Sequence, residues 1–189
     1  MMRDLGSAQR LNLPIHRHVR FVLVRPHYPE NLGASARALK AMGFSDLALV
    51  RPSRLCVPEH DMAFKMAVKS WDVLDSVQSY DSIDAACAGY TCRVATTARR
   101  GVSGVRTPRT LSPELVERAA RAERSVLLFG NEKTGLSEDE TAGVDYALRI
   151  PMAADQPSIN LAQAVQLVAY ELFIAALEAR HSDLGDAVG

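Results

Sequence analysis

Three short stretches carry polar side chains whose types and spacing could serve chemistry, and each follows a predicted strand. They are 25–44 with Asn31, Gly33 and Arg37; 127–140 with Glu132; and 149–179 with Ser158 and Asn160. Amide, carboxylate and guanidinium groups beyond the carboxyl ends of buried strands are typical of ligand sites in α/β proteins. These stretches are therefore the candidate functional site.

In the first stretch, Gly33 and Arg37 lie four residues apart on a predicted helix that Asn31 could cap and Gly43 would end. Residues at this spacing are neighbours on a helix surface. A glycine costs a helix about 1 kcal/mol relative to alanine, so Gly33 suggests that another group approaches the backbone closely beside the Arg37 guanidinium. The alternative is a tolerated glycine in the first turn with Arg37 in solvent.

The second stretch, "LLFGNEKTGLSEDE", matches neither the G-x-G-x-x-G pattern nor a Walker A loop. Lys133 and Thr134 precede Gly135 instead of following a glycine-rich cradle, which disfavours a nucleotide-phosphate site. Glu132 could be a functional carboxylate or only a charge at a helix terminus. Ser158 in the third stretch has a similar alternative, because it could be an ordinary helix N-cap.

The elements that must position these residues alternate between strands and helices, which predicts an α/β fold with a mostly parallel sheet. The predicted strands are short apolar runs at 20–26, 46–52, 91–97, 125–130 and 146–152. Helix starts are predicted at Ser82, at Ser112 before Pro113, and at Ser137, whose capping box would include Glu140. We expect a loose arm at 1–18, one domain at 19–180 and a tail at 181–189.

Composition points to a soluble cytosolic protein. Hydrophobic residues make up 48% of the 189 residues and charged residues 23%, and the N-terminus lacks the apolar core of a signal peptide. No apolar run is expected to span a membrane. The three cysteines, Cys56, Cys87 and Cys92, form no C-x-x-C pair, so we expect reduced thiols and no metal.

The net charge is zero, but the basic residues are unevenly distributed and mostly arginine. Of the 22 basic residues 18 are Arg, with five in 1–25 and eight in 91–124. Arginine grips phosphate with a planar fork, which would suit RNA, although an Arg-rich solvated surface is an equal interpretation of the clusters alone.

Taken together, the three stretches resemble the ordered motifs of the SPOUT class of RNA 2′-O-methyltransferases, in its SpoU/TrmH group and closest to its TrmJ-like members. The matching residues are Asn31-x-Gly33-x-x-x-Arg37, then Phe129-Gly130-x-Glu132-x-x-Gly135-Leu136, then Ile150-Pro151-Met152 with Pro157-Ser158-Ile159-Asn160-Leu161. The stretch "VATTARR" at 94–100 is also similar to the TrmJ-like pattern. The resemblance covers about residues 19–178.

The resemblance implies a SPOUT fold with a C-terminal deep trefoil knot that binds S-adenosylmethionine without a metal. It implies catalytic or organising roles for Arg37, Ser158, Asn31, Glu132 and Asn160. It implies donor contacts at Thr96, Thr97, Ala98, Leu128, Gly130, Ile150, Met152, Pro157, Ser158 and Ile159. Because an arginine is hard to deprotonate, Arg37 is expected to bind phosphate and stabilise the developing alkoxide; whether it also takes the proton stays open.

The implied substrate is a ribose 2′-hydroxyl of RNA, with tRNA in its anticodon-loop region favoured, because DNA lacks that group. An rRNA 2′-O-methyltransferase of the same fold and a non-catalytic RNA- or nucleotide-binding α/β protein are the alternatives. TrmJ-like proteins usually continue into a helical extension that helps to hold tRNA. Either this sequence is a catalytic fragment, or the Arg-rich segments 1–25 and 98–109 grip the RNA instead.

The helix predicted from Leu161 to Leu177 is apolar nearly all round, with Gln163, Gln166 and Glu171 as its clearly polar residues. One sheet can cover only part of such a surface. We therefore expect a homodimer with this helix, including Phe173, in the interface, in agreement with the pairing of knotted regions that the resemblance implies.

Overall fold

The computed structural model describes residues 11–99, 102–153 and 158–186. A seven-stranded sheet forms its centre, with strand order β3-β2-β1-β6-β4-β7-β5. Every pairing between these strands is parallel. The strands are β1 (Val19–Val24), β2 (Leu47–Val50), β3 (Gln78–Tyr80), β4 (Cys92–Thr96), β5 (Val105–Arg106), β6 (Ser125–Phe129) and β7 (Tyr146–Leu148). The α/β expectation with a mostly parallel sheet is confirmed.

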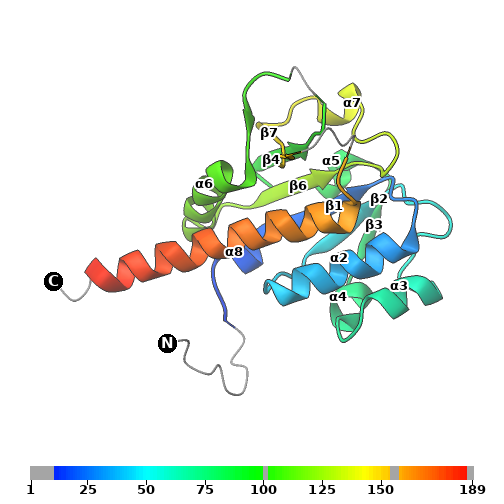
Figure 1. The fold of residues 1–189 in the computed structure, drawn as a ribbon, viewed down its shortest axis with the longest axis horizontal. Helices are drawn as coiled ribbons and strands as arrows, with labels where there is room; N and C mark the ends of the chain where they lie inside the picture. The colour runs from blue at the N-terminus through cyan, green and yellow to red at the C-terminus, as the bar shows by residue number, and fades with distance from the viewer. Residues whose placement is uncertain (1–10, 100–101, 154–157, 187–189) are drawn as a thin grey trace.

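Helices cover both faces of the sheet, and the long α8 lies beside α2 and α6 across one of them (Figure 1). The helices are α1 (Ile15–His18), α2 (Pro29–Ala41), α3 (Asp61–Met66), α4 (Trp71–Asp75), α5 (Ile83–Ala86), α6 (Pro108–Ala120), α7 (Glu138–Thr141) and α8 (Leu161–Asp186).

Two hydrophobic clusters follow from the two-residue period of the strands. In β1, Phe21 and Leu23 point to the cluster beneath α2, α6 and α8, whereas Val22 and Val24 point to the cluster beneath α5. All four side chains are fully buried. A strand buried on both faces reads as a continuous apolar run, which is why the central strands could be predicted.

The sheet order also departs from a simple doubly wound arrangement. β6 lies between β1 and β4, and β7 lies between β4 and β5, so later strands are inserted between earlier ones. The carboxyl ends of β4, β6 and β7 are thereby brought together at one edge. The trefoil knot itself stays a prediction.

Several helix starts differ from those predicted. α2 begins at Pro29 after Tyr28, not at Asn31, and α6 begins at Pro108 with Thr107 as its N-cap, so Pro113 lies inside the helix. In both cases a proline with its preset φ occupies the first turn. The caps at Ser82 and Ser137 are confirmed, the latter with its complete capping box.

The ends of the domain also differ from the expected boundaries. Leu13 and Ile15, placed in a loose arm by the sequence, are buried in the core, so the packed domain begins before residue 19. At the other end, α8 continues through the expected tail to Asp186. By length and composition alone, residues 161–182 of α8 could cross a membrane. In this structure, Val165, Val168 and other apolar residues of α8 are buried in the hydrophobic core of the domain.

Candidate active site

Glu132 is held by the beginning of α2. Its carboxylate accepts hydrogen bonds from the backbone N–H groups of His27 at 3.0 Å and Tyr28 at 3.3 Å, and from the Asn31 side-chain amide at 2.8 Å. The first N–H groups of a helix lack partners within the helix, and a negative charge there is favourable. Glu132, although distant in sequence, therefore supplies the charge at the head of α2.

The same network continues into α8. The Asn160 side-chain oxygen accepts from the backbone N–H groups of Ala162 at 3.0 Å and Gln163 at 3.3 Å, so Asn160 caps α8. Its amide nitrogen then donates to the Asn31 oxygen at 2.9 Å. Each side-chain amide has one acceptor and one donor group. The N–H donors of α8 at one end and the Glu132 carboxylate at the other therefore fix which group donates in each hydrogen bond of the network.

Three of the predicted functional residues, Glu132, Asn31 and Asn160, thus form one continuous network that joins the loop after β6 to the heads of α2 and α8. Neither Asn31 nor Ser158 is a helix cap. Asn31 lies in the first turn of α2 and is buried, and the cap of α8 is Asn160. The alternative for Glu132, a charge at a helix terminus, is partly right, because its charge does serve the terminus of α2.

Arg37 stands apart from this network. It lies six residues beyond Asn31 on α2, which is about 9 Å along the helix axis. Its side chain is exposed, and no hydrogen bond or ion pair of Arg37 is found among the described residues. Among the described residues of a single chain, Arg37 therefore makes no hydrogen bond with the other predicted catalytic groups and does not line a cavity with them.

The close approach expected at Gly33 is present, but a helix makes it. A Cβ at Gly33 would lie 2.0 Å from the carbonyl oxygen of Ala63 in α3. Only a glycine allows α2 and α3 to pack at this distance, so packing accounts for Gly33 without any ligand. Arg37 lies on the same flank of α2, one turn further on.

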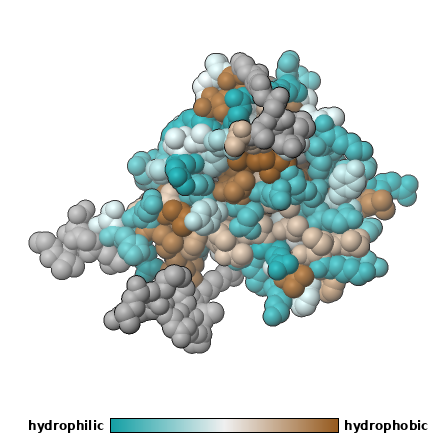
Figure 2. Space-filling view, in the orientation of Figure 1, coloured by the Kyte–Doolittle hydropathy of each residue, from teal (hydrophilic) through white to brown (hydrophobic). Residues whose placement is uncertain are grey.

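A cavity of about 740 Å³ opens at the carboxyl ends of β4, β6 and β7. In Figure 2, hydrophobic residues gather in a hollow above the N-terminal half of α8. The residues expected at the donor site that line the cavity are Thr96, Thr97, Ala98, Gly130, Ile150, Met152, Ser158 and Ile159. Glu132 lines it too. Leu128 does not, and Pro157 lies outside the described residues.

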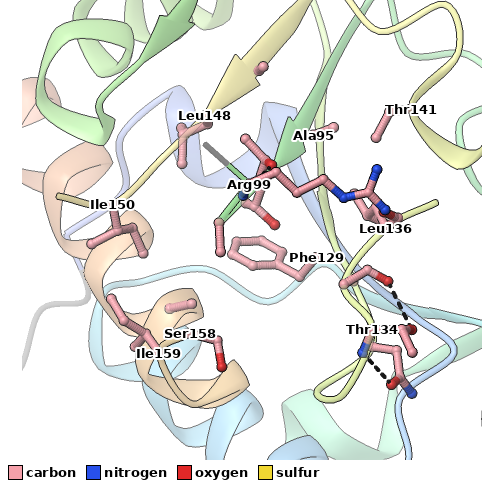
Figure 3. Close-up of a pocket in the computed structure, with 18 of the residues that line it drawn as sticks. Ala95, Arg99, Phe129, Thr134, Leu136, Thr141, Leu148, Ile150, Ser158 and Ile159 are labelled. Carbon is pink, nitrogen blue, oxygen red and sulfur yellow. Dashed lines mark hydrogen bonds between the residues drawn. The ribbon is translucent and has the colours of Figure 1, made fainter. Parts of the chain in front are cut away.

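The walls of the cavity come from separate parts of the chain. Figure 3 shows Ile150, Ser158 and Ile159 on one side and Thr134, Leu136 and Thr141 on the other, with the Phe129 ring between them. Leu128 is fully buried within β6, and its carbonyl oxygen accepts a hydrogen bond from the Thr96 hydroxyl at 3.0 Å. Its carbonyl is therefore already engaged with β4.

Gly130 allows the loop that forms one wall to fold back. A Cβ at Gly130 would lie 2.3 Å from the backbone of Gly135 and Leu136. The loop closes through the Gly135 N–H, which donates to the Asn131 carbonyl at 2.8 Å, and Gly135 itself has a φ of +66°. Both glycines are thus required by the backbone conformation of the loop, and they affect a ligand only through the position of this loop.

Sequence reasoning missed Phe129 and Arg99 as lining residues. The Arg99 side chain extends across the cavity mouth and donates to the Leu136 carbonyl at 3.0 Å, which ties the segment after β4 to the loop after β6 (Figure 3). Arg99 lies in the stretch 94–100, which is similar to the TrmJ-like pattern, and in the Arg-rich segment 98–109, but neither predicted that it lines the cavity. Its position could not be read from local sequence.

The lining of the cavity suits a ligand with an aromatic or apolar body more than proton transfer. Among the described residues, its titratable side chains are Arg99, Glu132, Lys133 and Glu138. Glu132 is occupied by three N–H donors, and the Glu138 carboxylate is almost fully exposed. Among the described residues, no cluster of His, Cys, Asp or Glu could hold a metal ion. The arrangement can bind and orient a ligand through apolar contacts and backbone groups.

Comparison with known proteins places this architecture in a family. Residues 18–170 match the model of the SpoU rRNA Methylase family. The chain is 35% identical over 168 residues to a tRNA (cytidine/uridine-2′-O-)-methyltransferase TrmJ of Sodalis glossinidius; the match covers 88% of this chain and 64% of that relative.

Two solved structures have the same fold. TrmJ from Z. mobilis ZM4 superposes with a TM-score of 0.75 at 34% identity, covering 82% of this chain and 69% of that one. An AdoMet-bound rRNA methyltransferase from Sinorhizobium meliloti gives a TM-score of 0.65 at 25% identity, covering 85% and 57%. With a family match over more than half of its length, the chain belongs to the SpoU rRNA methylase family.

Proposed function

We propose that the protein is an S-adenosylmethionine-dependent RNA methyltransferase that methylates a ribose 2′-hydroxyl of tRNA in the anticodon-loop region. The observation that carries this proposal is the joining of two features in one SpoU-family chain: a largely apolar cavity at the strand ends, and the Glu132–Asn31–Asn160 network beside it. The relatives' names support tRNA as the substrate.

The cavity fits the methyl donor in size and chemistry. Its volume of about 740 Å³ lies within the range of small-molecule sites, and its lining combines apolar side chains with the backbone of three loops. Thr96, Gly130, Ile150, Met152 and Ile159 would hold the donor. When bound, S-adenosylmethionine supplies an electrophilic methyl group. The described residues then need mainly to orient the ribose and exclude water.

The roles of the polar residues follow from their positions. Ser158 at the cavity wall would orient the 2′-hydroxyl, while Glu132, Asn31 and Asn160 hold the surrounding loops in place. Arg37 would bind the adjacent phosphate and stabilise the developing alkoxide. Exposed guanidinium groups after β4, such as that of Arg99, would attract the RNA backbone.

A homodimer would resolve the separation of Arg37 from the cavity, because a second copy could bring its own Arg37 to the site. The surface of α8 supports this pairing. Leu167 and Tyr170, three residues apart on one face, have exposed fractions of 41% and 45%. Phe173, by contrast, stacks against His16 with ring centroids 6.2 Å apart and packs on the core of its own chain.

Tyr170→Glu should therefore dissociate the dimer without disturbing the fold, whereas Phe173→Glu would damage the monomer. Leu55→Glu is the matched control, because Leu55 is an exposed hydrophobic residue outside α8. Light scattering at micromolar concentration should give two chains for the wild type and the control, and one chain for the variant. A fully active wild-type monomer would disprove the pairing.

Mixing two inactive variants tests whether the active site is shared. An Arg37→Ala chain retains an intact cavity, and a Gly130→Val chain retains its arginine. If Arg37 acts on the partner's cavity, mixed dimers regain methyl transfer. If the activity of the mixture stays at the level of the separate variants, Arg37 acts within its own chain or not at all.

The reaction itself is tested by transfer of a labelled methyl group to purified RNA. Label should enter tRNA at a ribose, and a transcript with a 2′-deoxynucleotide at the modified position should accept none. Label in rRNA alone would favour the rRNA alternative. Binding of S-adenosylmethionine without transfer to either RNA would favour a non-catalytic binding protein.

A further inference from the structure

Arg25 follows β1 directly and adopts an unusual backbone conformation. Its φ is +52°, in the left-handed region that favours glycine, and a proline follows it. Arg51, at the equivalent position after β2, has a φ of +46° and also precedes a proline. Strained residues persist only when the surrounding structure holds them, and they cluster at functional sites. Both arginines contact Glu140, but Arg25 makes more hydrogen bonds than Arg51.

The Arg25 guanidinium binds the far side of the loop that forms one wall of the cavity. It donates to both carboxylate oxygens of Glu140, at 2.7 and 2.8 Å, and to the carbonyl of Gly135 at 3.1 Å. The backbone of Arg25 is bound as well, because the Asn131 side-chain amide donates to its carbonyl at 2.6 Å. A single residue thus contacts both ends of the loop 131–135.

Glu140 connects this contact to α7, the helix after the loop. Its carboxylate accepts from the Ser137 N–H at 2.9 Å, and its own N–H donates to the Ser137 hydroxyl at 3.2 Å. Hydrogen bonds from Arg25 lower the pKa of Glu140 to about 2, so the carboxylate stays charged in any ordinary buffer. A bidentate pair of this kind fixes the orientation of the Glu140 carboxylate relative to Arg25 as well as the distance between them.

The opposite surface of the same segment faces the cavity. Thr134, Gly135, Leu136, Glu138 and Thr141 all line it, whereas neither Arg25 nor Glu140 does. We propose that Arg25 is a positioning residue: by gripping Gly135 and Glu140 from behind, it holds the loop 131–135 and α7 in the conformation that binds the methyl donor. This inference rests on the assignment of the cavity to S-adenosylmethionine made above.

Arg25→Gly separates this role from a merely structural one. Glycine adopts a positive φ without strain, which offsets part of the lost ion pair, so the variant should still fold, although with a lower melting temperature. Donor affinity should nevertheless fall by about 10- to 100-fold, the range expected when hydrogen bonds of a charged group are lost. The KM for the donor should rise, while kcat at saturating donor stays within a few-fold of the wild type.

Arg51→Gly is the matched control. Like Arg25, Arg51 is an arginine with a positive φ that precedes a proline. It makes only one contact with Glu140, at 3.2 Å, from a half-exposed side chain. Its donor affinity should stay within about threefold of the wild type, because exposed ion pairs contribute little. Arg25→Lys should not restore affinity, since a point charge cannot bind Gly135 and both oxygens of Glu140 in the same geometry.

Calorimetry with S-adenosylhomocysteine, the stable demethylated product, measures all of these affinities. Wild-type affinity in Arg25→Gly or Arg25→Lys would overturn the inference, as would an equal loss in Arg51→Gly. If Arg25→Gly fails to fold, Arg25→Asn, which also tolerates a positive φ, replaces it under the same criteria. A wild type that does not bind the product at all would instead refute the proposed function.

Discussion

Gly33→Ala tests whether Gly33 serves packing or an approaching RNA. A Cβ at this position would lie 2.0 Å from the Ala63 carbonyl, and real Cβ contacts are essentially never shorter than 3.0 Å, so α2 and α3 must separate by about 1 Å. The obstacle is backbone, which cannot rotate away as a side chain could.

The expected loss of stability in Gly33→Ala is the difference between two opposing contributions. Overpacking of a buried contact costs about 3 kcal/mol when backbone must shift, whereas alanine gains about 1 kcal/mol over glycine within a helix. The net loss of about 2 kcal/mol corresponds to a melting temperature lower by about 4–8 °C for a domain of this size. Thermal unfolding followed by circular dichroism measures it.

Arg37→Ala is the matched comparison, because it changes the exposed residue one turn further along the same flank. It should keep the wild-type melting temperature and lose activity. The reasoning would be refuted if Gly33→Ala melted at or above the wild-type temperature and yet lost methyl transfer. That result would mean that the glycine is retained for a ligand and that the contact with α3 adjusts easily.

Arg37→Ala should lower methyl transfer by roughly 10²–10³-fold, the effect of removing one preorganised electrostatic group, and Arg37→Lys should also be poor; activity within a few-fold of the wild type would refute the assignment. Gly130→Val should abolish donor binding in calorimetry because its side chain would displace the backbone of the loop at Gly135, and normal binding would place the donor elsewhere. Because the folded-state pKa of Glu140 is lowered to about 2 from 4.5, its charge stabilises the fold above the unfolded-state pKa, and this contribution is lost as the pH falls through about 2. The stability advantage of the wild type over Glu140→Gln, measured by denaturant unfolding, should therefore shrink between about pH 5 and pH 2; an advantage that does not change with pH would contradict the ion pair with Arg25.

The elements that could be predicted are those whose conformation depends on residues close together in the sequence. β1 and β6, buried on both faces, could be read as continuous apolar runs, and the cap at Ser137 depends only on residues up to Glu140. β3 and β5 could not be found this way. They have three and two residues, none fully buried, and they form only because a longer strand beside each offers hydrogen-bonding partners.

The family resemblance marked Asn31, Glu132 and Asn160, and the structure joins their side chains in one hydrogen-bond network. The hydrogen bonds that connect these residues could not be predicted from the sequence. Asn31 was expected to cap its own helix, but the carboxylate of a residue 101 positions away recruits its amide, and Asn160 takes the capping role at α8.

Only the tertiary structure decided which of the conspicuous residues face one another. Gly33 meets α3, and Arg37 is exposed and does not line the cavity of its own chain. Arg25, which no motif marked, contacts the wall of that cavity from behind. The physical reason is that strand order, and not sequence order, sets which loops share an edge of the sheet. The insertion of β6 and β7 between earlier strands involves pairings far apart in the chain, which no local pattern of residues records.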